Sequence, residues 1–238
     1  PKRWSNSGFQ DTLLYTLQGL AGTIINTQQI ENRTYVIGGN FEISSALNLT
    51  FNEPADVYLN NMYANLILNQ GDTLTSKSTF SSHESSRIIV KPGAELIIDG
   101  GIFSNLEDEL WPGIEIWGDA DLPQSLPLNQ GKIHILNEGT IENAEIGILV
   151  GKRSDDDYNQ YDPDYAGGLI WCNDGHIKNN KIGVLFTPYD EYNHSFFRRT
   201  SFITDAELAD STYPNCFVKA LGTNEVKFYG CEFKNERN

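Results

Sequence analysis

The sequence contains little alanine, a single methionine and few basic residues, and helix-rich chains rarely have such a composition. One methionine occurs among 238 residues, and 17 Lys and Arg stand against 32 Asp and Glu, for a net charge of −15. Nucleic-acid binding requires a clustered basic face, and an anionic membrane surface repels an acidic chain. No apolar run approaches the ~18–20 residues of a membrane-spanning helix. We therefore expect no nucleic-acid partner and no direct insertion into a membrane.

Cysteine is also scarce, with Cys172, Cys216 and Cys231 as the whole set. An odd number excludes a fully paired disulfide framework within the chain. No Cys/His spacing indicates zinc. A Cys216–Cys231 bridge stays open if a late turn of the chain brings the two together; otherwise the cysteines serve as small buried hydrophobes.

Aromatic residues are abundant, with 12 Phe and 11 Tyr, and they favour pleated, half-buried surfaces. Short apolar segments with a period of two follow one another, separated by Gly, Asn, Asp, Pro or Ser. They are too short and too irregularly spaced for hairpins with two-residue turns, so they fit a coil that bends every few residues. These segments are Thr23–Ile25, Thr34–Ile37, Phe41–Ile43, Leu47–Phe51, Val57–Leu59, Leu66–Leu68 and Leu96–Ile98.

One segment, Gly131–Val150, is repeated as Gly168–Phe186. The two align without a gap over 133–150 and 169–186, and a shorter third copy precedes them. Each unit is too small to bury its apolar face alone, whereas stacked units bury a continuous core. The Ile and Val positions shared by the copies, Ile141/Ile177 and Ile148/Val184, should be inward-facing layers.

The repeats predict an all-β fold, a right-handed parallel β-helix over 23–238. Residues 1–22 are expected to form a lead-in or cap, with a short helix over Asp11–Leu20, because Asp11 can cap it and Gly19 can end it. Loop excursions are expected at 119–130, 151–167, 188–195 and 204–214. A rigid scaffold carries function on its loops, so binding should occur there.

Polar residues end successive copies of the repeat. Aligned amides in stacked strands can hydrogen bond from one coil to the next, which predicts a structural ladder. A row of ligand-binding amides is the functional alternative. The ladder positions are Asn105, Asn143, Asn179, Thr204 and Asn235.

A resemblance to a known family is carried by Leu110–Asp119 followed by Gly131–Val150. The pair resembles the W-x-G-I-x-V-x-G … Q-G-x-I-x-I-x-N … I-E-N-A-x-x-G-I pattern of large secreted surface proteins of Bacteroidetes. The resemblance implies a pectate-lyase-like β-helix, type IX secretion through a separate C-terminal sorting domain, and adhesion or gliding. It also implies a secreted or cell-surface location. The start at Pro1 suggests either that a leader was removed or that the sequence is a piece of a longer chain. The matching residues are Trp111, Gly113, Ile114, Gly118, Gln130, Gly131, Ile141, Glu142, Asn143, Ala144 and Gly147.

An acidic stretch within the longest excursion is the candidate metal site. Several carboxylates within ten residues could bind Ca²⁺, which takes six to eight oxygen ligands. The spacing is not that of an EF-hand, and a solvated acidic loop is the structural alternative. Ca²⁺ is the one cofactor that the sequence suggests, with Asp155, Asp156, Asp157, Asp162 and Asp164 as its ligands.

Two enzymatic alternatives use nearby residues. A polysaccharide lyase would need a Lys or Arg base beside a Ca²⁺-bound sugar, and Lys152, Arg153, Arg198 and Arg199 are the candidates. Alternatively, Arg198 and Arg199 cap carboxylates on neighbouring loops, because adjacent residues of a strand point to opposite faces. A glycoside hydrolase would need two carboxylates across a cleft. Its candidate residues are Glu115, Asp119 and Asp121, with Trp111 and Trp117 stacking on the sugar or, alternatively, packing on the β-helix body.

The prediction favours a noncatalytic extracellular scaffold or adhesin segment that presents loops to glycan or protein partners. The lyase or hydrolase on the same scaffold is the first rival. The second is a passenger cargo bound to a secretion or surface complex.

Overall fold

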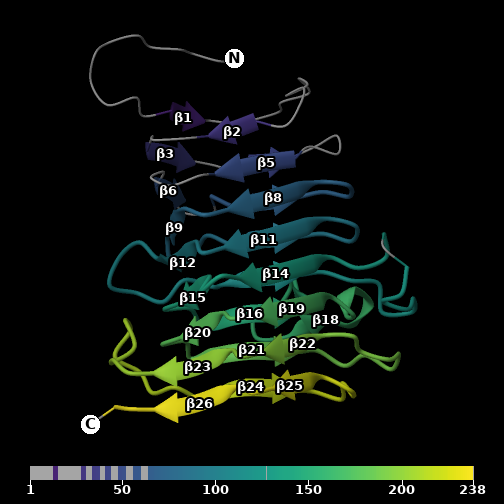
Figure 1. Cartoon of the computed structure of the whole chain (residues 1–238). Helices are drawn as coiled ribbons and strands as arrows, with labels where there is room; N and C mark the ends of the chain where they lie inside the picture. Colours follow the sequence, from purple (N-terminus) through teal and green to yellow (C-terminus); the bar gives the residue numbers. More distant parts are fainter. Residues whose placement is uncertain are drawn as a thin grey trace.

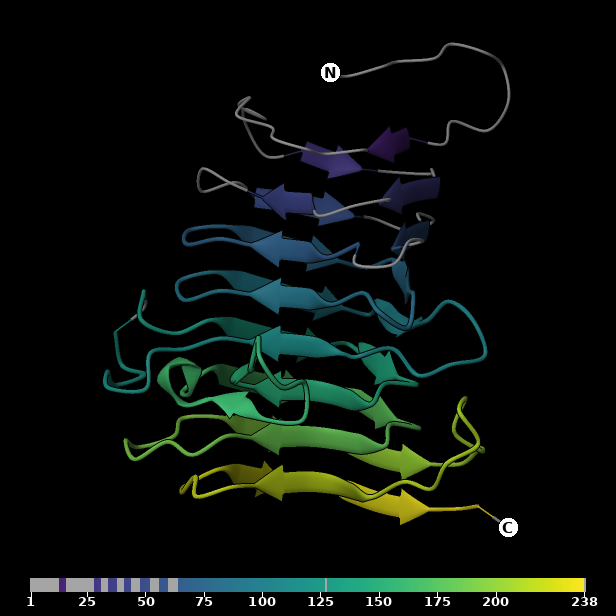
Figure 2. The same ribbon diagram turned by 180° about the vertical axis from the view of Figure 1, so that it is seen from behind.

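The chain winds into three parallel sheets, stacked coil upon coil along one axis (Figure 1). The computed structural model describes residues 13–15, 28–30, 34–37, 41–43, 48–51, 56–59, 64–126 and 128–237. Each full coil adds one strand to sheet B, then one to sheet A, then one to sheet C. Viewed along the axis from the N-terminal coils, the chain turns clockwise as it recedes (Figures 1 and 2), so the predicted right-handed parallel β-helix is confirmed.

The strands of each sheet pair in parallel with those of the coils before and after. Sheet A contains β1 (Leu13–Tyr15), β3 (Thr34–Ile37), β6 (Asp56–Leu59), β9 (Thr79–Ser82), β12 (Ile102–Asn105), β15 (Thr140–Glu142), β20 (His176–Lys178), β23 (Ser201–Thr204) and β26 (Glu232–Asn235). Sheet B contains β2 (Gln28–Ile30), β5 (Asn48–Phe51), β8 (Thr73–Ser76), β11 (Glu95–Asp99), β14 (Lys132–Leu136), β19 (Leu169–Asn173), β22 (Phe196–Arg198) and β25 (Lys227–Tyr229). Sheet C contains β4 (Phe41–Ile43), β7 (Leu66–Leu68), β10 (Ile88–Val90), β13 (Ile114–Ile116), β16 (Ile146–Val150), β21 (Ile182–Phe186) and β24 (Cys216–Ala220).

The core is a column of side chains that stack on their own kind. The predicted inward layers are confirmed: Ile141 pairs with Ile177 and Ile148 with Val184, and none of the four is more than 1% exposed. Aromatic rings stack in the same way between other coils. Burying each such side chain stabilises the fold by about 1.5–3 kcal/mol, but only when a neighbouring coil covers it.

The corner between sheets B and A varies in length from coil to coil. The segment between β19 and β20 has two residues, and its first, Asp174, has φ 60°. The corresponding segment between β14 and β15 has three, with Asn137 at φ 50° and Glu138 at φ 64°. The gap-free alignment is therefore wrong by one residue before this corner, since Ile133 pairs with Ile170 and not with Leu169. A shift of one residue exchanges the two faces of a strand.

The expected N-terminal helix is wrong where the structure describes it, because Leu13–Tyr15 forms β1 and pairs with β3 in sheet A. The β-helix thus begins before residue 23. The rest of the predicted cap, and the predicted segment Thr23–Ile25, lie outside the described residues. The other predicted apolar segments coincide with strands. The Cys216–Cys231 bridge is not formed, and all three cysteines are free.

Candidate functional site

Three of the four predicted excursions leave the β-helix at the same corner, between sheets C and B. They are 119–130, 151–167 and 188–195, whereas 204–214 connects sheet A to sheet C. The side chain of Gln124 joins all three, because its Nε2 donates to the Gly167 carbonyl at 2.9 Å and its Oε1 accepts from the His194 amide at 2.6 Å. Gln124 is only 5% exposed. The excursions therefore support one another as a packed unit.

The longest excursion, 151–167, folds back over the outer face of sheet C. It begins with β17 (Lys152–Arg153), which pairs antiparallel with β18 (Tyr161–Asp162), and it ends in the 3₁₀ turn η1 (Pro163–Tyr165). Its tip reaches the opposite corner, where the Tyr158 hydroxyl donates to Glu145 at 2.8 Å. This long path places charged side chains between the excursion and the sheet.

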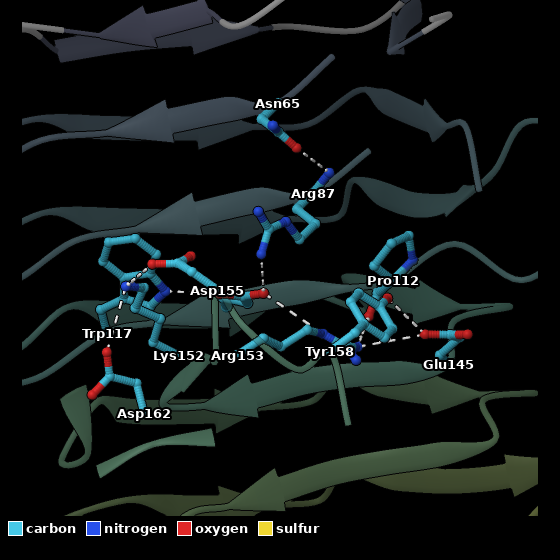
Figure 3. A network of polar contacts seen from close by, with 11 residues as sticks. Asn65, Arg87, Pro112, Trp117, Glu145, Lys152, Arg153, Asp155, Tyr158 and Asp162 are labelled. Carbon is cyan, nitrogen blue, oxygen red and sulfur yellow. Dashed lines mark hydrogen bonds and ion pairs between the residues drawn. The ribbon is translucent and has the colours of Figure 1, made fainter. Parts of the chain in front are cut away.

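A buried carboxylate on β13, the middle strand of sheet C, anchors the excursion. Figure 3 labels three of its partners, Arg87, Trp117 and Arg153. Glu115 on β13 is 2% exposed and accepts hydrogen bonds from Arg87 Nη1 at 3.0 Å and Trp117 Nε1 at 2.8 Å. Arg153 Nε lies 3.6 Å from Glu115, and Arg153 Nη2 donates to the Pro112 carbonyl at 3.0 Å. Two guanidinium groups from distant parts of the chain thus converge on one carboxylate, which ties β10, β13 and β17 together.

Lys152 forms a second anchor toward the other side of the same face. Its ammonium group lies 2.8 Å from Asp155 and 3.5 Å from Asp162, and it sits over the rings of Trp117 and Tyr165 at 5.2 and 4.7 Å. The hydrogen bond with Asp155 raises the pKa of Lys152 and lowers the pKa of Asp155. Ion pairs with Asp155 and Asp162 therefore stabilise Lys152 as a cation.

A surface pocket of about 380 Å³ adjoins this network. At the edge of this pocket, the guanidinium group of Arg153 lies 4.2 Å from the centre of the Tyr158 ring. Burial raises the pKa of Tyr158. Both signs of charge line the pocket. Its residues are Glu84, Ser85, Arg87, Pro112, Glu145, Ser154, Asp155 and Tyr158.

The predicted metal ligands do not come together. Asp155 and Asp162 bind Lys152, while Asp157 accepts hydrogen bonds from the amide of Asn159 and the side chain of Gln160. Asp156 and Asp164 complete the predicted set. Throughout the described ranges, no group of three or more His, Cys, Asp or Glu side chains is placed to hold a metal ion. The acidic stretch instead supports its own loop through short-range hydrogen bonds.

The predicted lyase residues are also separated. Arg198 and Arg199 lie at the end of β22 in sheet B, whereas Lys152 follows β16 in sheet C. Arg199 occupies a corner position with φ 47° and binds Asp174 of the preceding coil at 2.5 Å. The prediction that Arg198 and Arg199 form one basic site with Lys152 and Arg153 is therefore wrong, because the two pairs follow strands of different sheets.

The two tryptophans have different surroundings. Trp111 is fully buried in the core and donates from Nε1 to the Glu142 carbonyl at 2.8 Å, so its prediction as a ligand platform is wrong. Trp117 is partly exposed, but Glu115, Lys152 and Tyr165 surround it. Because Glu115 pairs with Arg87 and Arg153, it does not provide the free carboxylate that the hydrolase prediction requires.

Among the predicted ladder positions, Thr204 and Asn235 are paired residues of neighbouring strands, and Asn105, Asn143 and Asn179 lie at or just beyond the ends of their strands. Their side chains bond elsewhere, however. Asn143 donates to Ser104 at 3.1 Å, and Asn179 accepts from the Asp205 amide at 3.0 Å. The amide-to-amide ladder is wrong because positive φ at Asn143 and Asn179 turns the chain at the corner.

The neighbouring residue Asn180, which the sequence did not single out, connects two coils instead. Its Oδ1 accepts from the Ala144 amide at 2.8 Å and its Nδ2 donates to the Ile141 carbonyl at 3.0 Å. Asn180 is 5% exposed. Its only signal in the sequence is the doubled Asn at positions 179 and 180, within the second copy of the repeat.

A stripe of rings on the outer face of sheet B is a second feature that the repeat alignment did not predict. His134, Trp171 and Phe196 are paired residues of three successive coils, and all are partly exposed. The ring centres of His134 and Trp171 lie 4.8 Å apart, and those of Trp171 and Phe196 lie 6.4 Å apart. The gap-free alignment placed Trp171 over the inward Ile135, so the corrected register is what reveals this aromatic stripe.

Comparison of the chain with protein-family models, curated proteins and solved structures found no match. In the described part of the chain, no helix is long and apolar enough to cross a membrane. The structure is a parallel β-helix in which three excursions contact one another at the corner between sheets C and B. The 151–167 excursion is anchored to sheet C, and aromatic rings form a stripe on the outer face of sheet B.

Proposed function

We propose that the chain is a noncatalytic scaffold of a secreted or cell-surface protein, and that it binds a glycan on the outer face of sheet B. The aromatic stripe of His134, Trp171 and Phe196 carries this proposal. Sugar rings present C–H faces that pack on aromatic rings, and exposed apolar patches with polar borders are typical of binding surfaces. Figure 1 looks toward this sheet, with the long excursions at its sides.

Polar groups flank the stripe on the same face. Arg198 lies over the rings of Phe196 and Tyr229 at 6.0 and 5.9 Å, and Asn173 is its register partner in the preceding coil. Glu95 and Lys132 pair in register on the opposite side of the stripe. Hydroxyl groups of a bound sugar would find both donors and acceptors beside the rings.

The charged residues under the 151–167 excursion support a noncatalytic role. A lyase or hydrolase needs a base or a carboxylate pair free to exchange a proton with substrate. Glu115 is buried between arginines, and Lys152 is held as a cation by Asp155. The network therefore serves to hold the excursion in place.

A glycan array followed by calorimetric titration of the bound oligosaccharide tests the proposal. Trp171→Ala should weaken binding about 5- to 10-fold, the worth of one aromatic contact, whereas Trp171→Phe should retain most of the affinity. Tyr213→Ala, at a residue 80% exposed on the 204–214 excursion, is the matched control. Unchanged affinity of Trp171→Ala, or an array without a bound glycan, would refute glycan binding. Chain cleavage of the bound oligosaccharide would refute the noncatalytic role.

A further inference from the structure

One arginine on the outer face of sheet B has no acidic partner. Arg198 on β22 is exposed, and within the described ranges its side chain makes no hydrogen bond or ion pair. Arg87, Arg153 and Arg199, by contrast, each lie within 3.6 Å of a carboxylate oxygen. Because β22 is paired with β19 on one side and with β25 on the other, the coils on both sides of Arg198 are present and neither supplies it with an anion.

The residues around Arg198 hold its guanidinium group beside the aromatic stripe. It lies 6.0 Å from the ring centre of Phe196 on the same strand and 5.9 Å from that of Tyr229, its register partner in the next coil. Asp174 of the preceding coil is already bound by Arg199, which donates from Nε and Nη2 at 2.5 and 2.6 Å. The rings attract the cation but accept none of its N–H groups in the plane of the fork. A planar fork of free donors matches an oxyanion such as a carboxylate or a sulfate.

A second cation lies at the same end of the stripe. Lys227 is the register partner of Phe196 in the next coil and so faces outward with it. Its ammonium group donates to the hydroxyl of Tyr192, a neutral group that leaves the positive charge uncompensated. This end of the face is therefore positive, although the whole chain carries a net charge of −15.

The opposite end of the same face has no free positive charge. Lys132 on β14 pairs in register with Glu95 on β11, and Lys77 lies 3.4 Å from Asp99. Asp99 and Arg198 occupy the same outward row of sheet B three coils apart, which is roughly 14 Å for strands about 4.8 Å apart. The charge of the face thus changes along the axis of the β-helix, and only the end at β22 can receive an anionic group.

We infer that the glycan is anionic at one end and lies along the β-helix axis. Arg198 binds its carboxylate or sulfate group, and neutral sugar rings lie over Trp171 and His134. This inference rests on the glycan binding proposed above. A polymer with an anionic group on every sugar ring fits the face less well, because its further charges would lie beside Glu95 and Asp99.

Calorimetric titration of each charged glycan that the array identifies, beside its uncharged counterpart, tests the inference. Methyl esterification neutralises a carboxylate and desulfation removes a sulfate, so the two treatments distinguish the two anions. In about 0.15 M NaCl distant charges are screened beyond about 8 Å. Neutralising the anionic group should weaken binding about fivefold, the worth of one favourable exposed ion pair.

Variants locate the contact. Arg198→Gln should weaken binding of the charged glycan about fivefold and leave its neutral counterpart unchanged, so that the two changes are not additive. Arg198→Lys should retain part of the affinity, because it keeps the charge without the fork. Lys132→Gln is the matched control: it removes the same charge from the opposite end of the face and should change the affinity less than about twofold. Arg198 is exposed and Lys132 is partly exposed, so circular dichroism should show unchanged folds.

The possible failures are distinguishable. An array without a bound glycan would refute glycan binding itself, and this inference with it. If only neutral glycans bind, or if Arg198→Gln weakens the charged glycan no more than Lys132→Gln does, the anionic end is overturned while the aromatic site stands. An oligomer with a charge on every ring that binds as tightly as a glycan charged at one end would overturn the one-ended arrangement.

Discussion

Replacing Glu115 with glutamine should loosen the 151–167 excursion and destabilise the β-helix. The substitution keeps the shape of the side chain but removes the one carboxylate that faces Arg87 at 3.0 Å and Arg153 at 3.6 Å. Arg153 is 5% exposed and Arg87 27%, so neither cation is fully solvated.

The magnitude follows from these contacts. Removing one partner of a buried ion pair costs about 3–5 kcal/mol. The lower end, about 3 kcal/mol, is expected because Arg87 reaches solvent and Arg153 retains Glu145 at 3.6 Å. Glu145→Gln is the matched control: Glu145 binds the same Arg153 but is 41% exposed, so its loss should cost less than about 1 kcal/mol.

Urea unfolding followed by far-UV circular dichroism measures the global cost. Hydrogen exchange of 152–162 measures the local one, and it should rise in Glu115→Gln while β14 and β15 stay protected. The anchoring role of Glu115 is refuted if Glu115→Gln costs no more than Glu145→Gln, or if exchange in the excursion is unchanged.

Three further predictions concern the scaffold. Gly113 has φ +100° and an added Cβ would lie 1.7 Å from a carbonyl oxygen of β16, so Gly113→Ala should lower the urea midpoint far more than Gly222→Ala; at Gly222 φ is +77° and the nearest atom is 3.8 Å away. Equal midpoints for the two variants would contradict the close approach. Burial raises the pKa of Cys172 to about 12, so a thiol reagent at pH 8 should titrate two cysteines in the folded protein and three after unfolding. A third fast thiol would contradict this. The hydrogen bond from His134, 2.6 Å away, lowers the pKa of Glu95 from 4.5, so the folded state binds fewer protons than the unfolded state. This stabilisation is complete above about pH 4.5 and is lost as the pH falls through the lower folded pKa, so Glu95→Gln should flatten the acid limb of a stability-versus-pH curve. If the acid limb of the Glu95→Gln variant is as steep as that of the unaltered protein, the interaction between Glu95 and His134 does not stabilise the fold.

Much of the fold could be predicted because it repeats. Short period-two segments and the recurring Asn and Gly indicated a stacked coil, and the inward layers at Ile141 and Ile177 followed from it. The exact register could not be predicted, because Asn137–Gly139 and Asn173–Gly175 are so alike that they align without a gap. The difference of one corner residue becomes visible only through strand pairing, and it decides that Trp171 faces outward.

The network around Glu115 could not be predicted for another reason. Arg87 lies 28 residues before it, and Arg153 comes from the excursion that follows β16, the third strand after β13. No local spacing connects the three; they meet because β10 and β13 are adjacent and the excursion folds back over them. The acidic run in 151–167 resembles a metal site because the sequence does not show that Asp155 and Asp162 pair with Lys152.

The variable corner between sheets B and A has a genetic consequence. Loss or gain of one codon at 137–139 changes only how sharply the chain turns, because the strands on either side keep their own partners in adjacent coils. The same event within β15 would reverse the inward and outward residues of the rest of that strand. Insertions and deletions of single codons should therefore be tolerated at these corners more readily than within strands. Duplicated coils should differ first in the number of residues between their strands.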